Sequence, residues 1–198
     1  MNVVAIEGAC LSGKTSTIHA LRGLLPAGDV AWCPEYMDIP NVLARTHSIV
    51  DAPLALSDLR FLLRIEARRR RWALHTSPNA KTFVLDRSIH SLLAHRYAVS
   101  RAFGLDLFTR SCELVDRSYA QYLPDTVFYL DLDDKTRWHR RKAGDHRQLE
   151  FMDSTYNSLF RDYFIPKLLY GSGAVEIMDA GQLAHSNACV IRDKIMSK

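Results

Sequence analysis

The stretch that decides the fold is Asn2-Val3-Val4-Ala5-Ile6-Glu7-Gly8-Ala9-Cys10-Leu11-Ser12-Gly13-Lys14-Thr15. It opens with an apolar run typical of a buried strand, continues through the pattern G-x-x-x-x-G-K-[ST], and leads into residues with helical periodicity. This strand–loop–helix context is the one in which the pattern binds phosphate. The alternative is a tight turn that carries glycine and lysine without that role. The sequence therefore predicts a nucleotide-binding loop.

The loop offers a nucleotide several kinds of contact. Its glycines let the backbone wrap phosphate oxygens, while backbone N–H groups and the helix N-terminus donate hydrogen bonds. Lys14 places a point charge at the β- and γ-phosphates, and the hydroxyl of Thr15 is expected to hold Mg²⁺. The expected nucleotide-binding residues are Gly8, Ala9, Cys10, Leu11, Ser12, Gly13, Lys14, Thr15 and Ser16.

Beyond the loop, short apolar runs alternate with longer segments of helical periodicity, which is the pattern of an α/β protein with a mainly parallel sheet. Strands are expected near residues 2–6, 29–33, 82–86, 126–131 and 174–178. Helices are expected near 14–25, 55–75, 88–102, 106–122, 134–142, 150–169 and 183–196. Because no repeat or linker divides the sequence, one domain over residues 1–198 is expected.

Composition narrows the function classes. The 198 residues are 47% hydrophobic and 24% charged, enough for one sizeable core, and a net charge of +4 is too small to indicate a nucleic-acid binder unless the basic residues cluster. The cysteines Cys10, Cys33, Cys112 and Cys189 are widely spaced, which favours reduced thiols and a cytoplasmic location. No apolar run reaches the ~18 residues of a membrane span, and no basic region precedes the first one, so neither insertion nor secretion is expected.

Two further strand ends carry acids. The run 82–85 ends at Asp86-Arg87-Ser88, and the run 29–33 is followed by Pro34-Glu35. Since the carboxyl ends of parallel strands face the ligand crevice, Asp86 is expected to reach Mg²⁺ directly or through water, and Arg87 the acceptor or the transferring phosphoryl group. Glu35 is expected either to accept a proton from an acceptor hydroxyl or to orient a sugar or an arginine. A salt-bridged strand end and an exposed loop acid are the plainer interpretations.

These residues resemble a known group. Ile6-Glu7-Gly8 before Ser12-Gly13-Lys14-Thr15, the Asp86-Arg87-Ser88 signature, and Pro124-Asp125 before the strand at 127–131 are similar to the thymidylate kinase and deoxynucleoside kinase group of P-loop kinases. The resemblance extends over nearly the whole chain. It implies a P-loop fold with a five-stranded parallel sheet flanked by helices, MgATP as phosphoryl donor, and a nucleoside or nucleoside monophosphate as acceptor.

Two arginine clusters take their expected roles from this resemblance. On the helix at 55–75, Arg64, Arg68 and Arg71 share a face, and Arg64 or Arg68 is the candidate contact for an acceptor phosphate. A second cluster lies where the fold places a lid, about residues 137–150, and there Arg137 is expected to bind the donor while Arg140 and Arg141 stabilise transition-state charge. Leu149-Glu150-Phe151 resembles the deoxynucleoside kinases and makes Glu150 a substrate-binding candidate. For the first cluster the alternative is a solvated basic face or a nucleic-acid contact, and for the second it is a nonspecific RNA contact.

The expected function is ATP-dependent phosphoryl transfer to a nucleoside monophosphate, with Lys14, Glu35, Asp86, Arg87, Arg140 and Arg141 as catalytic residues. The alternatives are a deoxynucleoside kinase, a kinase of another small hydroxyl compound such as an antibiotic, and a regulatory module that binds nucleotide without turnover. The expected partner is a small molecule, with neither a membrane nor a nucleic acid. Apolar helix faces at 55–75 and 88–102 could leave a surface for a homodimer.

Overall fold

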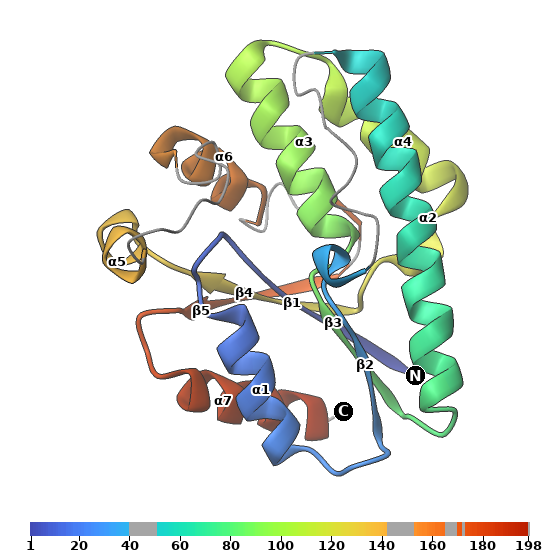
Figure 1. The fold of residues 1–198 in the computed structure, drawn as a ribbon, viewed down its shortest axis with the longest axis vertical. Coiled ribbons are helices and arrows are strands. Elements are labelled where there is room, and N and C mark those ends of the chain that lie inside the picture. The colour runs from blue at the N-terminus through green and yellow to red at the C-terminus, as the bar shows by residue number, and fades with distance from the viewer. Residues whose placement is uncertain (40–50, 142–152, 165–169, 172, 198) are drawn as a thin grey trace.

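A computed structural model describes residues 1–39, 51–141, 153–164, 170–171 and 173–197. Its centre is a sheet of parallel strands in the order β2-β3-β1-β4-β5 (Figure 1). The strands are β1 (Asn2–Gly8), β2 (Val30–Cys33), β3 (Thr82–Asp86), β4 (Thr126–Asp131) and β5 (Ala174–Asp179). The predicted five-stranded parallel sheet is therefore confirmed.

The chain leaves β1 toward one side of the sheet, builds β2 and β3 there, and then crosses to the other side for β4 and β5. The strand order therefore reverses at β1, which hydrogen-bonds to both β3 and β4. A reversal of this kind opens a crevice outside the carboxyl ends of the strands. The ends of β1 and β3 meet at that edge, with Ile6 in register with Asp86.

Helices cover both faces of the sheet. One face carries α1 (Lys14–Leu24) and α7 (Ala184–Met196), and the other carries α2 (Ala52–Thr76), α3 (Ile89–Phe103), α4 (Leu107–Ser118) and α6 (Ser154–Phe164) (Figure 1). The short helix α5 (Asp134–Arg140) follows β4, and two 3₁₀ turns, η1 (Tyr36–Asp38) and η2 (Ala120–Tyr122), follow β2 and α4. Each expected helix has a counterpart, and residues 142, 150–152 and 165–169 of the expected helices lie outside the described residues.

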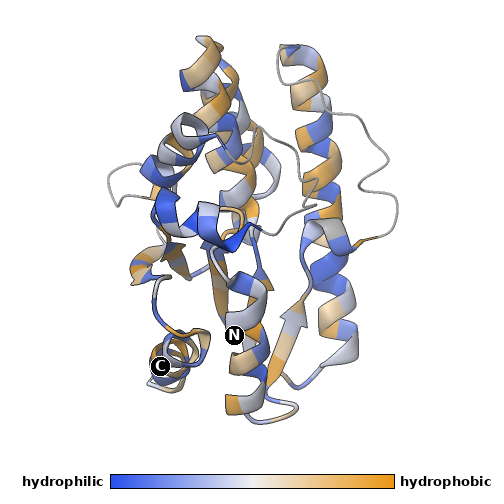
Figure 2. Ribbon diagram, turned by 60° about the vertical axis from the view of Figure 1, so that its left-hand side comes forward, coloured by the Kyte–Doolittle hydropathy of each residue, from blue (hydrophilic) through white to orange (hydrophobic). Residues whose placement is uncertain are grey.

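Alternating side chains divide the core into two layers. In β1, Val4 and Ile6 face α1 and α7, whereas Ala5 faces the α2–α3 side. Figure 2 shows the apolar strands in the middle of the molecule, between helices in which apolar and polar stretches alternate. Burial on both faces explains why these strands read as nearly continuous apolar runs in the sequence.

Side-chain caps fix where the helices begin. Asp51 accepts a hydrogen bond from the backbone N–H of Leu54 (2.9 Å), with a proline in the first turn of α2. Ser88 accepts from the backbone N–H of His90 (3.1 Å) at the start of α3, which ends at Gly104 with φ 65°. The cap on α3 matters for the site, because Ser88 directly follows Asp86 and Arg87.

Three other expectations can be compared with the structure. All four cysteines lie in the described part of the chain, and none of them forms a disulfide there. Among the described helices, none combines the length and apolar character that crossing a bilayer requires. On the α2 and α3 faces considered for a homodimer, Leu59, Leu63 and Leu93 are fully buried inside the molecule, and the homodimer itself stays a prediction.

Candidate active site

The phosphate loop connects β1 to α1 through backbone that only small residues adopt easily. A Cβ atom on Gly8 would lie 2.5 Å from the hydroxyl of Ser12 and 2.8 Å from the carbonyl oxygen of Leu130, and Gly13 has φ 89°. Leu11 also takes a positive φ, 64°, without being glycine. The backbone therefore curls tightly enough to surround an anion, as the pattern predicts.

Lys14 is buried inside this loop. Its Nζ donates to the carbonyl oxygens of Gly8 (3.0 Å) and Ala9 (2.9 Å). Burial, with a smaller contribution from the positive charge of Arg87, lowers the pKa of Lys14 to about 8. The hydroxyl of Ser12 is buried with no hydrogen-bond partner among the described residues. A buried ammonium and an unsatisfied hydroxyl at one loop fit a phosphate ligand, while Thr15 and Ser16 lie exposed at the start of α1.

Glu35 and Arg87 form the second part of the site. The Nε of Arg87 donates to Oε1 of Glu35, and Nη1 donates to the carbonyl oxygen of Gly8 (3.2 Å) and to Oγ of Ser91 (3.2 Å). Burial would raise the pKa of Glu35, but the nearby Arg87 and Lys14 outweigh it and hold this pKa below its usual range. Arg87 has φ 61°, a conformation that costs free energy in a non-glycine residue and occurs mainly at functional sites.

Asp86 lies between these two parts. Burial, reinforced by the negative charge of Glu35, raises the pKa of Asp86 to about 6. Its Oδ1 is buried and has no hydrogen-bond partner among the described residues. An unsatisfied carboxylate oxygen beside a phosphate loop fits a hard cation such as Mg²⁺, with the hydroxyl of Thr15 as a second oxygen ligand. The described residues hold no cluster of three His, Cys, Asp or Glu side chains that could bind a metal without the nucleotide.

The structure places both candidate arginines of helix α2 on its outer face, and their contact with an acceptor phosphate stays a prediction. Arg64 and Arg68 are exposed, and none of their contacts among the described residues joins them to Glu35, Asp86 or Arg87. Arg69 is turned inward instead and is 2% exposed. It donates to the carbonyl oxygens of Pro34 (2.6 Å), Asp86 (2.9 Å) and Arg87.

Arg69 is held by a buried network. Its Nε lies 2.5 Å from Oε2 of Glu66, and its guanidinium stacks on the ring of Tyr36 at 4.0 Å. Arg70 binds the other oxygen of Glu66 at 2.7 Å, and Tyr36 donates to Glu66 at 2.7 Å. The arginine therefore ties the ends of β2 and β3 together, so that the backbones on either side of the Glu35–Arg87 pair are fixed.

Glu7, the last polar residue before the loop, is completely buried. It accepts hydrogen bonds from the backbone N–H of Ser88 (2.7 Å), the hydroxyl of Ser88 (2.7 Å) and the hydroxyl of Ser91. The carboxylate thus connects β1 to the turn that carries Arg87.

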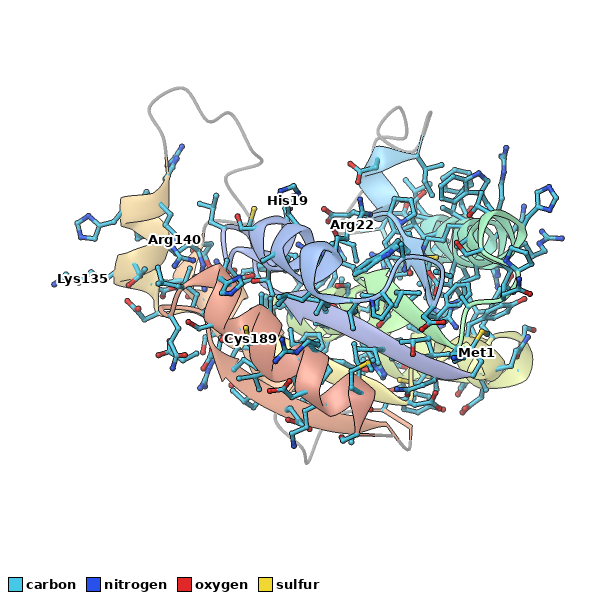
Figure 3. All side chains as sticks on the ribbon, turned by 90° about the horizontal axis from the view of Figure 1, so that it is seen from below. Met1, His19, Arg22, Lys135, Arg140 and Cys189 are labelled. Atoms are coloured by element: carbon cyan, nitrogen blue, oxygen red, sulfur yellow. The ribbon has the colours of Figure 1, made fainter. Side chains whose placement is uncertain are left out.

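Of the three expected lid arginines, one contacts the loop. Arg140 donates to the carbonyl oxygens of Leu11 (3.2 Å) and Ala180 (2.8 Å), and Figure 3 shows it directed from α5 toward the start of α1, while Lys135 points outward. Arg137 is buried, pairing with Asp134 and donating to the carbonyl of Leu132, which makes it a support of α5. Arg141 lies over Trp138. Glu150 and the rest of the expected lid, 142–150, lie outside the described residues.

Two signals in the sequence could have identified the buried charges. Glu7 is an acid inside an otherwise apolar strand, which indicates a charge kept for a specific partner. Glu66 and Arg69 continue the spacing of the buried Leu59, Leu62 and Leu63 along α2, so they lie on its inner face. The sequence analysis instead selected Arg64 and Arg68, which share the opposite face of the helix, because the resemblance implies an arginine contact from this helix to the acceptor.

Comparison with known proteins supports the same grouping. No family model matches the chain. A thymidylate kinase of Acholeplasma laidlawii (strain PG-8A) is 26% identical over 121 residues, which is 60% of this chain and 58% of that kinase, so the match spans less than two thirds of the relative's length. A structure of deoxyadenosine kinase from M. mycoides with dCMP and dCDP bound superposes with a TM-score of 0.70 at 15% identity, over 99% of this chain and 100% of that one.

A thymidylate kinase structure from Candida albicans gives a TM-score of 0.69 at 16% identity, covering 99% of this chain and 91% of that chain. At such identities the two structures establish a shared fold, and the sequence match to the Acholeplasma enzyme is independent of them. Together they confirm the resemblance of this chain to the thymidylate kinase and deoxynucleoside kinase group of P-loop kinases.

Proposed function

We propose that the protein is an ATP-dependent phosphotransferase that acts on a nucleoside monophosphate, as thymidylate kinases do. The observation that carries the proposal is the meeting of the phosphate loop and the Arg87 turn at one atom, since Lys14 and Arg87 both donate to the carbonyl oxygen of Gly8. A cation for the donor phosphates and a cation for the acceptor thereby lie at a common point. The catalytic unit is one domain of residues 1–198 with a lid at about 137–150.

The donor half uses the loop and α5. Lys14 and the loop N–H groups hold the β- and γ-phosphates, and Arg140 closes over them from α5. Asp86 and Thr15 are the residues that would hold Mg²⁺, which when bound neutralises charge on the donor phosphates. Because phosphoryl transfer needs little covalent chemistry from the protein, these residues act by positioning and by charge. Four cysteines without a disulfide among the described residues agree with a reducing compartment, and we assign the reaction to the cytoplasm.

The acceptor half uses Arg87 and Glu35. A monophosphate carries its own charged nucleophile and needs a cation nearby, which Arg87 supplies. Glu35 then keeps the guanidinium in place and orients the acceptor. The sequence similarity to a thymidylate kinase favours this acceptor.

A second candidate acceptor is a nucleoside hydroxyl. It is favoured by the direct pairing of Arg87 with Glu35, which offsets the charge that a phosphate would bind and holds a carboxylate ready as a base. It also agrees with the fold shared with a deoxyadenosine kinase.

A two-substrate assay distinguishes the candidates. Purified protein is incubated with radiolabelled ATP and each of the common nucleosides and their monophosphates, and the labelled products are separated. We expect transfer to a monophosphate, thymidylate first among those tested. Transfer to thymidine and not to thymidylate would establish the nucleoside reading instead.

The matched variant is Lys14→Ala, which removes the ammonium group that the carbonyl oxygens of Gly8 and Ala9 hold inside the loop. Activity should disappear while the circular dichroism spectrum is unchanged. Full activity in folded Lys14→Ala protein, or no transfer by the wild type to any acceptor, would refute the proposed function.

A further inference from the structure

The buried carboxylate of Glu7 receives only hydrogen-bond donors. The backbone N–H of Ser88 can act only as a donor, and it lies 2.7 Å from Oε1. The hydroxyl of Ser88 accepts from the backbone N–H of His90, so its own proton is directed to Oε1 of Glu7. The hydroxyl of Ser91 accepts from Nη1 of Arg87, so its proton is directed to Oε2. All three partners therefore require acceptor oxygens on residue 7.

This polarity sets the hydrogen bonds of Arg87. Nε binds Glu35, and Nη1 is shared between Gly8 and Ser91. Among the described residues Nη2 forms no hydrogen bond, so its donors are left for a ligand. Were the proton of Ser91 turned toward Arg87, two donors would face each other and the Nη1 bond would be lost.

We propose that Glu7 is the positioning residue that aims Arg87 at the acceptor substrate, by accepting from both serines and so holding the Arg87 turn in its left-handed conformation. This inference rests on the proposed function, in which Arg87 binds the acceptor. Glu7 itself touches no substrate, since it is completely buried beneath the turn. The alternative is that Glu7 merely anchors β1 to β3.

Glu7→Gln tests the proposal with almost no change in shape. A glutamine presents one acceptor and one donor group, so it must set its NH₂ against either Ser88 or Ser91. If the NH₂ faces Ser91, the serine proton loses its acceptor on residue 7 and must turn away, into competition with the donor group of Arg87. If it faces Ser88, it meets a backbone N–H. The matched control is Asp125→Asn, because Asp125 also accepts a hydrogen bond from the β1 backbone, from Val3 at 2.7 Å, but at the opposite end of the strand.

Three measurements separate positioning from anchoring. For Glu7→Gln we expect kcat/KM for the acceptor to fall on the order of 10²-fold, the loss typical of a misplaced catalytic group, with equilibrium ATP binding retained. Ser91→Ala should also lower kcat/KM for the acceptor. The double variant should have a kcat/KM no lower than that of Glu7→Gln, because both changes act through one network. Asp125→Asn should leave these values unchanged.

Equal losses of ATP binding and acceptor turnover in Glu7→Gln, or additive effects with Ser91→Ala, would overturn the proposal. If Glu7→Gln does not fold, Ser91→Ala alone decides: an unchanged kcat/KM for the acceptor would overturn the inference. A crystal structure of Glu7→Gln supplies a readout that is independent of activity. If Arg87 keeps its wild-type φ in that structure and its Nη1 still binds Ser91, the positioning role is refuted. This result does not depend on activity, whereas a wild type that phosphorylates no nucleotide would refute the proposed function.

Discussion

Replacing Arg69 by methionine should lower the free energy of unfolding by about 3–5 kcal/mol, whereas replacing its neighbour Arg68 by alanine should change it by at most ~0.5 kcal/mol. The two side chains are adjacent in the sequence, carry the same charge and start from the same helix. They differ in burial, since Arg69 is 2% exposed and Arg68 lies on the exposed face of α2.

The magnitude follows from what Arg69 would leave behind. Glu66 is fully buried, and without Arg69 it keeps Arg70 and Tyr36 but loses the ion pair at 2.5 Å. Removing one partner of a buried pair typically costs about 3–5 kcal/mol. The carbonyl oxygens of Pro34 and Asp86 also lose a donor, at about 1–3 kcal/mol each where water cannot replace it. These carbonyl oxygens lie near the crevice, so we expect water to replace the lost donor. The lost ion pair should therefore account for most of the change in the free energy of unfolding.

Urea unfolding followed by circular dichroism measures both variants, with acceptor kinetics on the folded protein. Arg69→Lys is a useful third variant, because it keeps the charge but cannot reach all three carbonyl oxygens, and it should lose turnover with a smaller loss of stability. An Arg69→Met protein within ~1 kcal/mol of wild type would refute the reasoning. An Arg68→Ala protein of unchanged stability but strongly raised acceptor KM would restore Arg68 as the phosphate contact.

Four further predictions concern the donor half and the core. Asp86→Asn should keep ATP binding and lose the Mg²⁺-dependent rate. In the wild type kcat/KM for ATP should fall as pH drops through about 6, where Asp86 gains a proton, and as pH rises through about 8, where Lys14 loses one, measured from pH 5 to 9. Arg140→Ala should lower kcat on the order of 10³-fold with a smaller effect on the KM for ATP. The control Lys135→Ala, at an exposed position of the same helix, should leave kcat unchanged. An effect of Arg140→Ala on KM alone would limit Arg140 to binding ATP. Burial lowers the pKa of His90 to about 3, so between pH 6.5 and 3 the unfolded chain takes up a proton that the native state does not. In urea unfolding, the free energy of unfolding of the wild type should therefore fall by about 1.4 kcal/mol per pH unit more than that of His90→Gln as the pH decreases. Equal slopes for the two proteins would contradict this.

The sheet and the phosphate loop were predictable because their signals are local. Strands buried on both faces are continuous apolar runs, and the loop pattern occupies eight consecutive residues from Gly8 to Thr15. The positions of Asp86 and Glu35 followed from a general property of parallel sheets, that the carboxyl ends of the strands share an edge.

The arginines were harder to assign because ion pairing is a property of the folded state. Residues 64 to 71 contain five arginines, and helical spacing alone gives two plausible faces. The deciding fact is that Glu66 is buried and binds Arg69 and Arg70. Burying one acid thus turns two basic residues toward the core, against the usual preference of arginine for the surface.

Buried ion pairs and hydrogen bonds also keep the two halves of the site at a fixed separation. The Glu66 network fixes the backbone around Glu35 and Arg87, and Glu7 fixes the serines beside Arg87. In both networks a buried charge is bound by polar partners in fixed orientations. Such a network makes a site more rigid than apolar packing does. The carbonyl oxygen of Gly8 then accepts from Lys14 and from Arg87 at 3.0 and 3.2 Å. Because one backbone atom sets the place of both cations, a shift of the loop moves both cations together. Their separation, on which the proposed phosphoryl transfer depends, is therefore preserved.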